Sequence, residues 1–164
     1  MSALHDGIRE KLRIRRDRLP HWQFGGSTYF VTFCSARGSL PDAALEQITK
    51  NVLYEHGRRA VIHFGSVMPD HCHLLIQPAQ APDETWHDLS LIMKSIKGVS
   101  SRRINQLLGT TGRVWQEESF DRIVRDENEF LEKLDYIWWN PVKAGLVADP
   151  RQYKFHINPL GLFE

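Results

Sequence analysis

The sequence is poor in cysteine and has no long hydrophobic run. Two of its 164 residues are cysteines, and they form no Cys-x-x-Cys pair, so a disulfide scaffold and a cysteine-rich zinc module are both excluded. No apolar run approaches the roughly 18 residues that a membrane-spanning helix needs, and the first residues lack the apolar stretch of a signal peptide. We therefore expect a reduced, soluble, cytoplasmic protein with no membrane partner.

An excess of charge of one sign is also missing. Lysine and arginine total 21 and aspartate and glutamate total 20, which gives a net charge of +1. A strongly basic field over the whole protein is therefore excluded, but a local basic patch is not. Residues 9–18 contain six cations, among them Arg13, Arg15 and Arg16, against two acids. On charge alone this segment is a solvated arm, although it could also lie along phosphate groups.

The length predicts one domain covering residues 1–164, with a basic N-terminal arm at 1–25 and a C-terminal tail at 150–164. Hydrophobic periodicity and turn residues define the elements between them. The expected strands are residues 29–34, 61–68, 71–76 and 114–124. The first expected helix begins at Pro41. The second begins at Leu89, with a kink or break near Gly98 and Ser100-Ser101, and the third begins at Asp126 and stops at Gly145. The order β-α-β-β-α-β-α predicts an α+β, ferredoxin-like antiparallel sheet with two helices on one face, which leaves the other face and the last helix for a site.

The expected strand at 71–76 carries the first pair of candidate ligands. His71 and His73 are two residues apart, so they point to the same side of the strand with Cα atoms roughly 6.6 Å apart. Two imidazoles at this spacing can bind one cation at about 2.0–2.2 Å from each nitrogen. A His-x-His pair alone, however, is more often two strand histidines bonded to backbone or water.

The last expected helix carries the complementary residues. Tyr136 and Asn140 are four residues apart on a polar face that also includes Glu129, Glu132 and Lys143. The amide oxygen of Asn140 can be the third ligand of a cation that two imidazoles bind, and this mixed nitrogen and oxygen set leaves the identity of the metal open. In the alternative interpretation, Tyr136 packs at the edge of the core and Asn140 caps a turn, because the proline that follows it disfavours helical geometry there.

Four stretches, taken in order, resemble the REP-associated tyrosine transposases of the HUH single-tyrosine transposase superfamily. They are MPDHCHLLIQP (68–78), MKSIKGVSSRRIN (93–105), VWQEESFDRIVRDENEF (114–130) and YIWWNPVKAGLV (136–147). The last stretch is the most specific, and the resemblance covers most of the chain. It implies that His71, His73 and Asn140 bind a divalent cation, Mg²⁺ or Mn²⁺, and that Tyr136 is the nucleophile.

The resemblance further implies an enzyme that cuts single-stranded DNA beside hairpins made by repetitive extragenic palindromes. Tyr136 would form a 5′-phosphotyrosine link, leave a free 3′-OH, and rejoin strands by the reverse step. Such chemistry needs a cation against the phosphate charge but no ATP, and the sequence has no Gly-x-x-x-x-Gly-Lys loop. Association with the nucleoid would follow. Relatives act as dimers, but no feature of this sequence decides between a monomer and a homodimer.

Basic residues near these motifs are the expected DNA contacts. They are Lys94, Lys97, Arg102 and Arg103 on the second helix, Lys143 on the last helix, and Arg13, Arg15 and Arg16 in the N-terminal arm. By charge pattern alone, the helix cations are a solvated face. Asp70 either orients one of the histidines or caps a turn. Among the aromatic residues, Trp115, Phe120 and Trp138 are expected in the core, and Trp139 is open between packing and base stacking.

The sequence also bears on two other functions. A nucleotide phosphohydrolase of the histidine-triad type is set aside because its third alternating histidine is Leu75 here. A catalytically inactive hairpin-binding protein of the same fold stays open. The sequence departs from the family in the small Cys72 between the histidines and in the tail RQYKFHINPLGLFE, which lacks the expected tryptophan- and serine-rich ending.

Overall fold

The computed structural model of the protein describes residues 15–19 and 26–163. The strands are β1 (Thr28–Ser35), β2 (Ala60–Val67), β3 (His71–Pro78), β4 (Trp115–Val124) and β5 (His156–Ile157). The helices are α2 (Asp42–Glu55), α3 (Leu89–Leu108) and α4 (Glu127–Lys143), with 3-10 turns η1 (Arg16–Arg18) and η2 (Pro150–Gln152). The α+β class and the element order expected from the sequence are confirmed.

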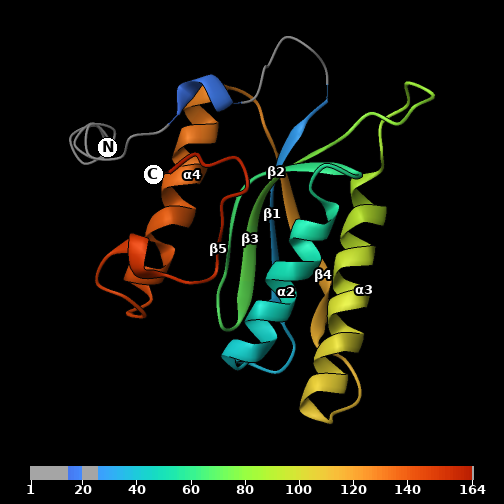
Figure 1. The fold of residues 1–164 in the computed structure, drawn as a ribbon, viewed down its shortest axis with the longest axis vertical. Helices are drawn as coiled ribbons and strands as arrows, with labels where there is room; N and C mark the ends of the chain where they lie inside the picture. Colours follow the sequence, from blue (N-terminus) through green and yellow to red (C-terminus); the bar gives the residue numbers. More distant parts are fainter. Residues whose placement is uncertain (1–14, 20–25, 164) are drawn as a thin grey trace.

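The five strands form one antiparallel sheet in the order β4-β1-β3-β2-β5. The first four strands have the ferredoxin-like order, with α2 and α3 on one face of the sheet and α4 on the other (Figure 1). The fifth strand comes from the C-terminal tail, to which the sequence pattern assigned no element, and it pairs with the free edge of β2.

Strand alternation divides the interior into two cores. On β3, Cys72 and Leu74 are buried against α2 and α3, whereas Leu75 is buried against α4. The small Cys72 side chain is fully buried in the first core, as its place in the strand pattern predicts. The second core is closed by residues of α4 and of the tail, namely Phe130, Leu134, Ile137, Trp138, Leu162 and Phe163.

Helix α3 continues without interruption through Gly98, so the expected break there is wrong. Two residues further on, the buried hydroxyl of Ser100 donates to the carbonyl of Ile96 at 2.6 Å. The same hydroxyl accepts a hydrogen bond from the indole nitrogen of Trp115 at 2.9 Å. Because that bond fixes the helix to β4, a residue that weakens helices in isolation is stabilised by tertiary packing.

Helix α4 begins at the expected cap and passes through a proline. The carboxylate of Asp126 accepts from the backbone N–H of Glu129 at 2.8 Å, which satisfies one free donor of the first turn. Pro141 lies inside the last turn and is buried. The residue before it, Asn140, remains helical, so it stays one turn beyond Tyr136 on the same face.

The C-terminal tail and residues 15–19 pack together on the α4 side of the sheet. The Phe163 ring stacks on Trp138 with centroids 3.9 Å apart. The backbone N–H of Arg15 donates to the carbonyl of Leu162 at 3.2 Å, and Leu19 is buried in the same core. This part of the expected N-terminal arm is therefore docked rather than solvated. Within the described ranges, no helix combines the length and apolar character needed to cross a bilayer.

The His156 side chain is expected to make the fold sensitive to acid. Burial lowers the pKa of His156 from 6.5 to about 4, so between these pH values the unfolded chain binds a proton that the folded chain does not. The free energy of unfolding then falls as the pH drops from about 6.5 towards 4, by up to about 3 kcal/mol from this residue. His156→Phe, which keeps a ring stacked on Trp138, should make this dependence less steep in urea unfolding at pH 7.5, 6 and 5. Equal pH slopes for the two proteins would contradict it.

Candidate active site

The two strand histidines lie together on the α4 face of the sheet. β3 begins at His71, directly after the turn at Pro69 and Asp70, and alternation sends His71 and His73 to the same side. Their ring centroids are 4.6 Å apart, with the planes inclined at 70°. The common orientation predicted from their spacing is therefore confirmed.

Each ring has one nitrogen fixed by a neighbouring polar side chain. His71 Nδ1 lies 2.6 Å from the carboxylate of Asp70, and His73 Nδ1 lies 2.7 Å from the hydroxyl of Thr32 on β1. Asp70 is therefore in contact with a histidine that it can orient, which is one of the two roles expected for it besides capping a turn. Because a carboxylate only accepts, the Nδ1 atom of His71 carries a proton that it donates to Asp70.

Asn140 of α4 faces the other nitrogen of the His71 ring. Its Oδ1 atom lies 3.2 Å from His71 Nε2. A proton on Nε2 would be donated to this oxygen, and without that proton the two atoms present lone pairs that one cation can bind. Adjacent ligands of an octahedral Mg²⁺ ion lie about 3 Å apart, since each is about 2.1 Å from the metal. The spacing therefore suits a shared cation.

His73 supplies a second free nitrogen beside them. The residue is 5% exposed, and within the described part of the chain its Nε2 atom has no hydrogen-bond partner. Burial, followed by the proximity of His71, lowers the pKa of His73 from 6.5 to about 3. The ring is therefore neutral near neutral pH, which is the form that binds metals.

Tyr136 stands next to this group with its side chain accessible. It is 43% exposed, and its ring packs edge-on against His73, with centroids 5.3 Å apart. Phe30 of β1 stacks on His73 at 5.4 Å and meets Tyr136 edge-on at 6.1 Å. The Lys143 ammonium lies 5.7 Å from the Tyr136 centroid. Two rings thus hold the phenol in place while solvent and ligands can reach it.

These residues fit a divalent cation, as judged by their donor atoms. In residues 15–19 and 26–163, no three His, Cys, Asp or Glu side chains cluster as a metal site, so the set depends on the amide oxygen of Asn140. Two imidazole nitrogens and one amide oxygen form a neutral, mixed set that suits several divalent ions. A phosphate oxygen bound next to it would lie beside the Tyr136 phenol.

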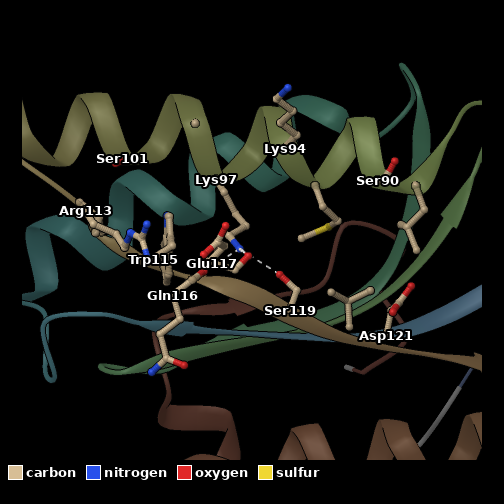
Figure 2. A pocket seen from close by; sticks show the side chains of 15 residues that line it. Ser90, Lys94, Lys97, Ser101, Arg113, Trp115, Gln116, Glu117, Ser119 and Asp121 are labelled. Atoms are coloured by element: carbon tan, nitrogen blue, oxygen red, sulfur yellow. Dashed lines mark hydrogen bonds between the residues drawn. The ribbon is translucent and has the colours of Figure 1, made fainter.

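The cations of α3 lie on the opposite face of the sheet from Tyr136. Lys97 and Lys94 line a cavity of about 550 Å³ between α3 and β4. Lys97 reaches across to β4, while Lys94 points away from the strand (Figure 2). The Lys97 ammonium donates to the carbonyl of Gln116 at 2.9 Å and the hydroxyl of Ser119 at 3.0 Å, and burial lowers its pKa. Lys97 therefore joins the helix to the strand.

The other expected contact residues are more dispersed. Arg102 and Arg103 are exposed on the same helix as Lys97, whereas Lys143 lies beside the tyrosine. In the N-terminal arm, Arg13 lies outside the described residues, Arg15 is exposed next to the tail, and Arg16 begins η1. Helix α4 thus places Lys143 beside Tyr136, whereas the sheet separates the α3 cations from the candidate active site.

The aromatic residues differ from expectation at one position. Trp115 and Trp138 are buried in the two cores, as predicted, and Trp139 is half-buried against the α4-side core, which favours packing over base stacking. Phe120 was expected in the core, but it is 69% exposed on β4. The pattern also missed Thr32 and Phe30, since their role depends on which residues β1 and β3 place opposite each other.

A family model and a curated relative that match this chain are both described as transposases. Residues 27–128 match the family described as "Transposase IS200 like", a range that contains both histidines and ends before Tyr136. A candidate REP-associated tyrosine transposase of Haemophilus influenzae is 28% identical over 94 residues, which cover 54% of this chain and 53% of that protein. The match thus spans about half the length of that relative.

A solved structure has the same fold. It is a REP-associated tyrosine transposase bound to a REP hairpin, with a TM-score of 0.66 and 23% identity, and the match covers 85% of this chain and 83% of that one. At this identity the likeness supports the fold alone. The match over residues 27–128, which is more than half of the sequence, establishes the relationship. This chain belongs to the IS200-like transposase family.

Proposed function

We propose that the protein is a metal-dependent enzyme that cuts and rejoins single-stranded DNA beside hairpins, through a phosphotyrosine at Tyr136. One observation carries the proposal: an accessible phenol packs against His73, the His73 ring lies beside that of His71, and His71 Nε2 lies 3.2 Å from Asn140 Oδ1. A nucleophile next to a neutral ligand set is the arrangement that phosphoryl transfer requires.

The bond changes can be assigned to named atoms. Tyr136 Oη attacks the phosphorus, the phosphorus–oxygen bond to the 3′ carbon of the preceding nucleotide breaks, and the departing oxygen takes a proton to become a free 3′-OH. The product is a tyrosine ester of the 5′-phosphate. The reverse attack by a 3′-OH restores the phosphodiester and frees the phenol. Because the ester retains the bond energy, no nucleotide triphosphate is consumed.

The residues around Tyr136 have separate tasks in this scheme. His71, His73 and Asn140 would hold Mg²⁺ or Mn²⁺, which supplies positive charge against the non-bridging oxygens of the phosphate. Asp70 and Thr32 keep the two imidazoles oriented with Nε2 free. Phe30 and His73 limit the movement of the phenol ring, which aligns its oxygen with the phosphorus.

The substrate is proposed to be DNA with hairpins of the repetitive extragenic type. The H. influenzae relative carries that association in its name, and the solved structure of similar fold holds a REP hairpin. The exposed cations Lys94, Arg102 and Arg103 of α3 offer phosphate contacts to the duplex part. An enzyme acting on such repeats would be found with the nucleoid.

The nucleophile can be tested by covalent capture. The unmodified protein, incubated with labelled hairpin oligonucleotides that carry single-stranded flanks and with Mn²⁺, is expected to give a band of reduced mobility on a denaturing gel. Tyr136→Phe should lower the yield of this adduct by at least roughly 10³-fold, because a phenyl ring has no attacking oxygen. Tyr54→Phe is the matched control, since Tyr54 is an exposed tyrosine on α2, on the far face of the sheet.

Binding of the hairpin without an adduct, in the presence of either metal, would favour the inactive DNA-binding protein instead. An adduct that persists in Tyr136→Phe would assign the nucleophile to another residue. Addition of EDTA is expected to abolish the adduct without removing hairpin binding, because the metal acts on the bond that breaks and not on the duplex.

The orienting role of Thr32 gives a separate prediction. Thr32→Val removes the hydroxyl that lies 2.7 Å from His73 Nδ1 with little change in volume. Loss of such a partner typically lowers metal affinity by about 10-fold or more, and we expect this decrease for Mn²⁺ in an equilibrium titration followed by electron paramagnetic resonance. Excess Mn²⁺ should restore adduct formation. Thr49→Val is the control, because that hydroxyl bonds within α2, and unchanged Mn²⁺ affinity in Thr32→Val would refute the assignment.

A further inference from the structure

The exposed ring of Phe120 lies in line with the candidate active site. In the sheet register, Phe120 of β4 is opposite Thr32 of β1, and Thr32 is opposite His73 of β3. Residues directly opposite each other in antiparallel strands point to the same side. Because Thr32 bonds to His73, and His73 contacts Tyr136, Phe120 projects from the face of the sheet that carries the nucleophile.

The last helix covers this part of the sheet incompletely. α4 packs mainly over β2 and β3, and it contacts β1 at Phe30 and β4 at Arg122. Phe120 is accordingly 69% exposed, and Phe30 and Thr32 beside it are half-buried. The result is a strip of sheet surface, formed by Phe120, Thr32 and Phe30, that runs from the edge strand to Tyr136.

Positive charge borders this strip on the helix side. The Lys133 ammonium lies 5.1 Å from the centroid of Phe30, and the Lys143 ammonium lies beside Tyr136. Arg122, opposite Phe30 on β4, is paired with Glu129 at 2.9 Å, so it adds less free charge. Both lysines contact rings at the Tyr136 end of the strip. A surface that combines cations with exposed aromatic rings is typical of sites for single-stranded nucleic acid, where phosphates meet the charges and bases stack on the rings.

The distance along the strip suits a nucleotide close to the cut. Two strand spacings of about 4.8 Å put the Cα atom of Phe120 about 10 Å from that of His73. Stacked nucleotides advance about 3.4 Å each along one strand, and extended ones advance further. A base on Phe120 would therefore lie within about three nucleotides of a phosphate bound beside Tyr136.

We propose that Phe120 is a stacking platform for an unpaired base of the DNA strand, within about three nucleotides of the phosphate that Tyr136 attacks. The proposal rests on the proposed function for the identity of the strand. It adds a subsite on β4 that holds the strand in register with the nucleophile. Because every base has a stacking face, the subsite contributes affinity and position and does not itself select a sequence.

The test asks whether removing the Phe120 ring weakens DNA binding only when the single-stranded flanks carry bases. The probe is a ten-base-pair DNA hairpin with ten thymidines on each side, and a second probe replaces the thymidines by abasic nucleotides. Binding is measured by fluorescence anisotropy in the Tyr136→Phe protein, so that the probe stays uncut. Adding Phe120→Ala is expected to weaken binding of the thymidine probe by about ten-fold and to leave binding of the abasic probe unchanged. Adding Phe120→Trp should retain the affinity.

Ile123→Ala is the matched control, since Ile123 is an exposed apolar residue of the same strand on the opposite face of the sheet. It should bind both probes like its parent. Equal affinity of Phe120→Ala and its parent for the thymidine probe would overturn the proposal. An equal loss on both probes would also overturn it, because the ring would then act without the bases. The proposal would also be overturned if the chain self-associates, if Phe120→Ala abolishes that self-association, and if binding of the thymidine probe is unaffected.

The outcome is separable from that of the proposed function. Adduct formation by the unmodified protein reports on Tyr136, whereas the binding measurement uses a protein that lacks the nucleophile. A base-dependent loss in Phe120→Ala without any adduct would support the stacking subsite and refute the enzyme. An adduct with no base-dependent loss would support the enzyme and refute the subsite.

Discussion

The two-residue period of β3 is the constraint on which the rest of the structure depends. One strand supplies buried side chains to both cores, with Cys72 and Leu74 toward α2 and α3 and with Leu75 toward α4. The same period sends His71 and His73 to the α4 face, where α4 leaves the upstream end of the strand partly open. A shift of register by one residue would bury the histidines against α2 and α3 and expose the apolar side chains. The packing that stabilises the sheet therefore also positions the ligand atoms.

Burial of His73 affects both the protonation state of its ring and the free energy of folding. Removing an imidazole from water disfavours its charged form, which is why the pKa of His73 falls to about 3. The hydroxyl of Thr32 satisfies one ring nitrogen, and the other remains without a partner in the described structure. An unsatisfied buried polar atom is unfavourable for folding, and this one belongs to a ring that contacts both His71 and Tyr136. A bound cation would provide the missing interaction.

Sequence patterns predicted features set by neighbours along the chain. The shared side of His71 and His73, and the shared helix face of Tyr136 and Asn140, follow from the periods of strand and helix and needed no tertiary information. Features that depend on pairing between distant segments were missed. The approach of Thr32 to His73, the addition of β5, the exposure of Phe120 and the continuity of α3 all depend on contacts between distant strands or between α3 and β4. The roles of the site residues follow from resemblance and geometry and stay predictions.

The sheet separates two kinds of surface that one DNA molecule would have to reach. The exposed cations of α3 lie on one face and Tyr136 lies on the other, so a strand that contacts both must pass around an edge of the sheet. β5 and the tail occupy one edge. The other edge is β4, where Lys97 ties α3 to the carbonyl of Gln116 and Phe120 projects toward the nucleophile. An edge strand rich in charged side chains resists pairing with other sheets, and here the same strand borders both the face that carries the basic helix and the face that carries the phenol. In the proposed scheme, a DNA strand that passes around this edge meets the exposed ring of Phe120.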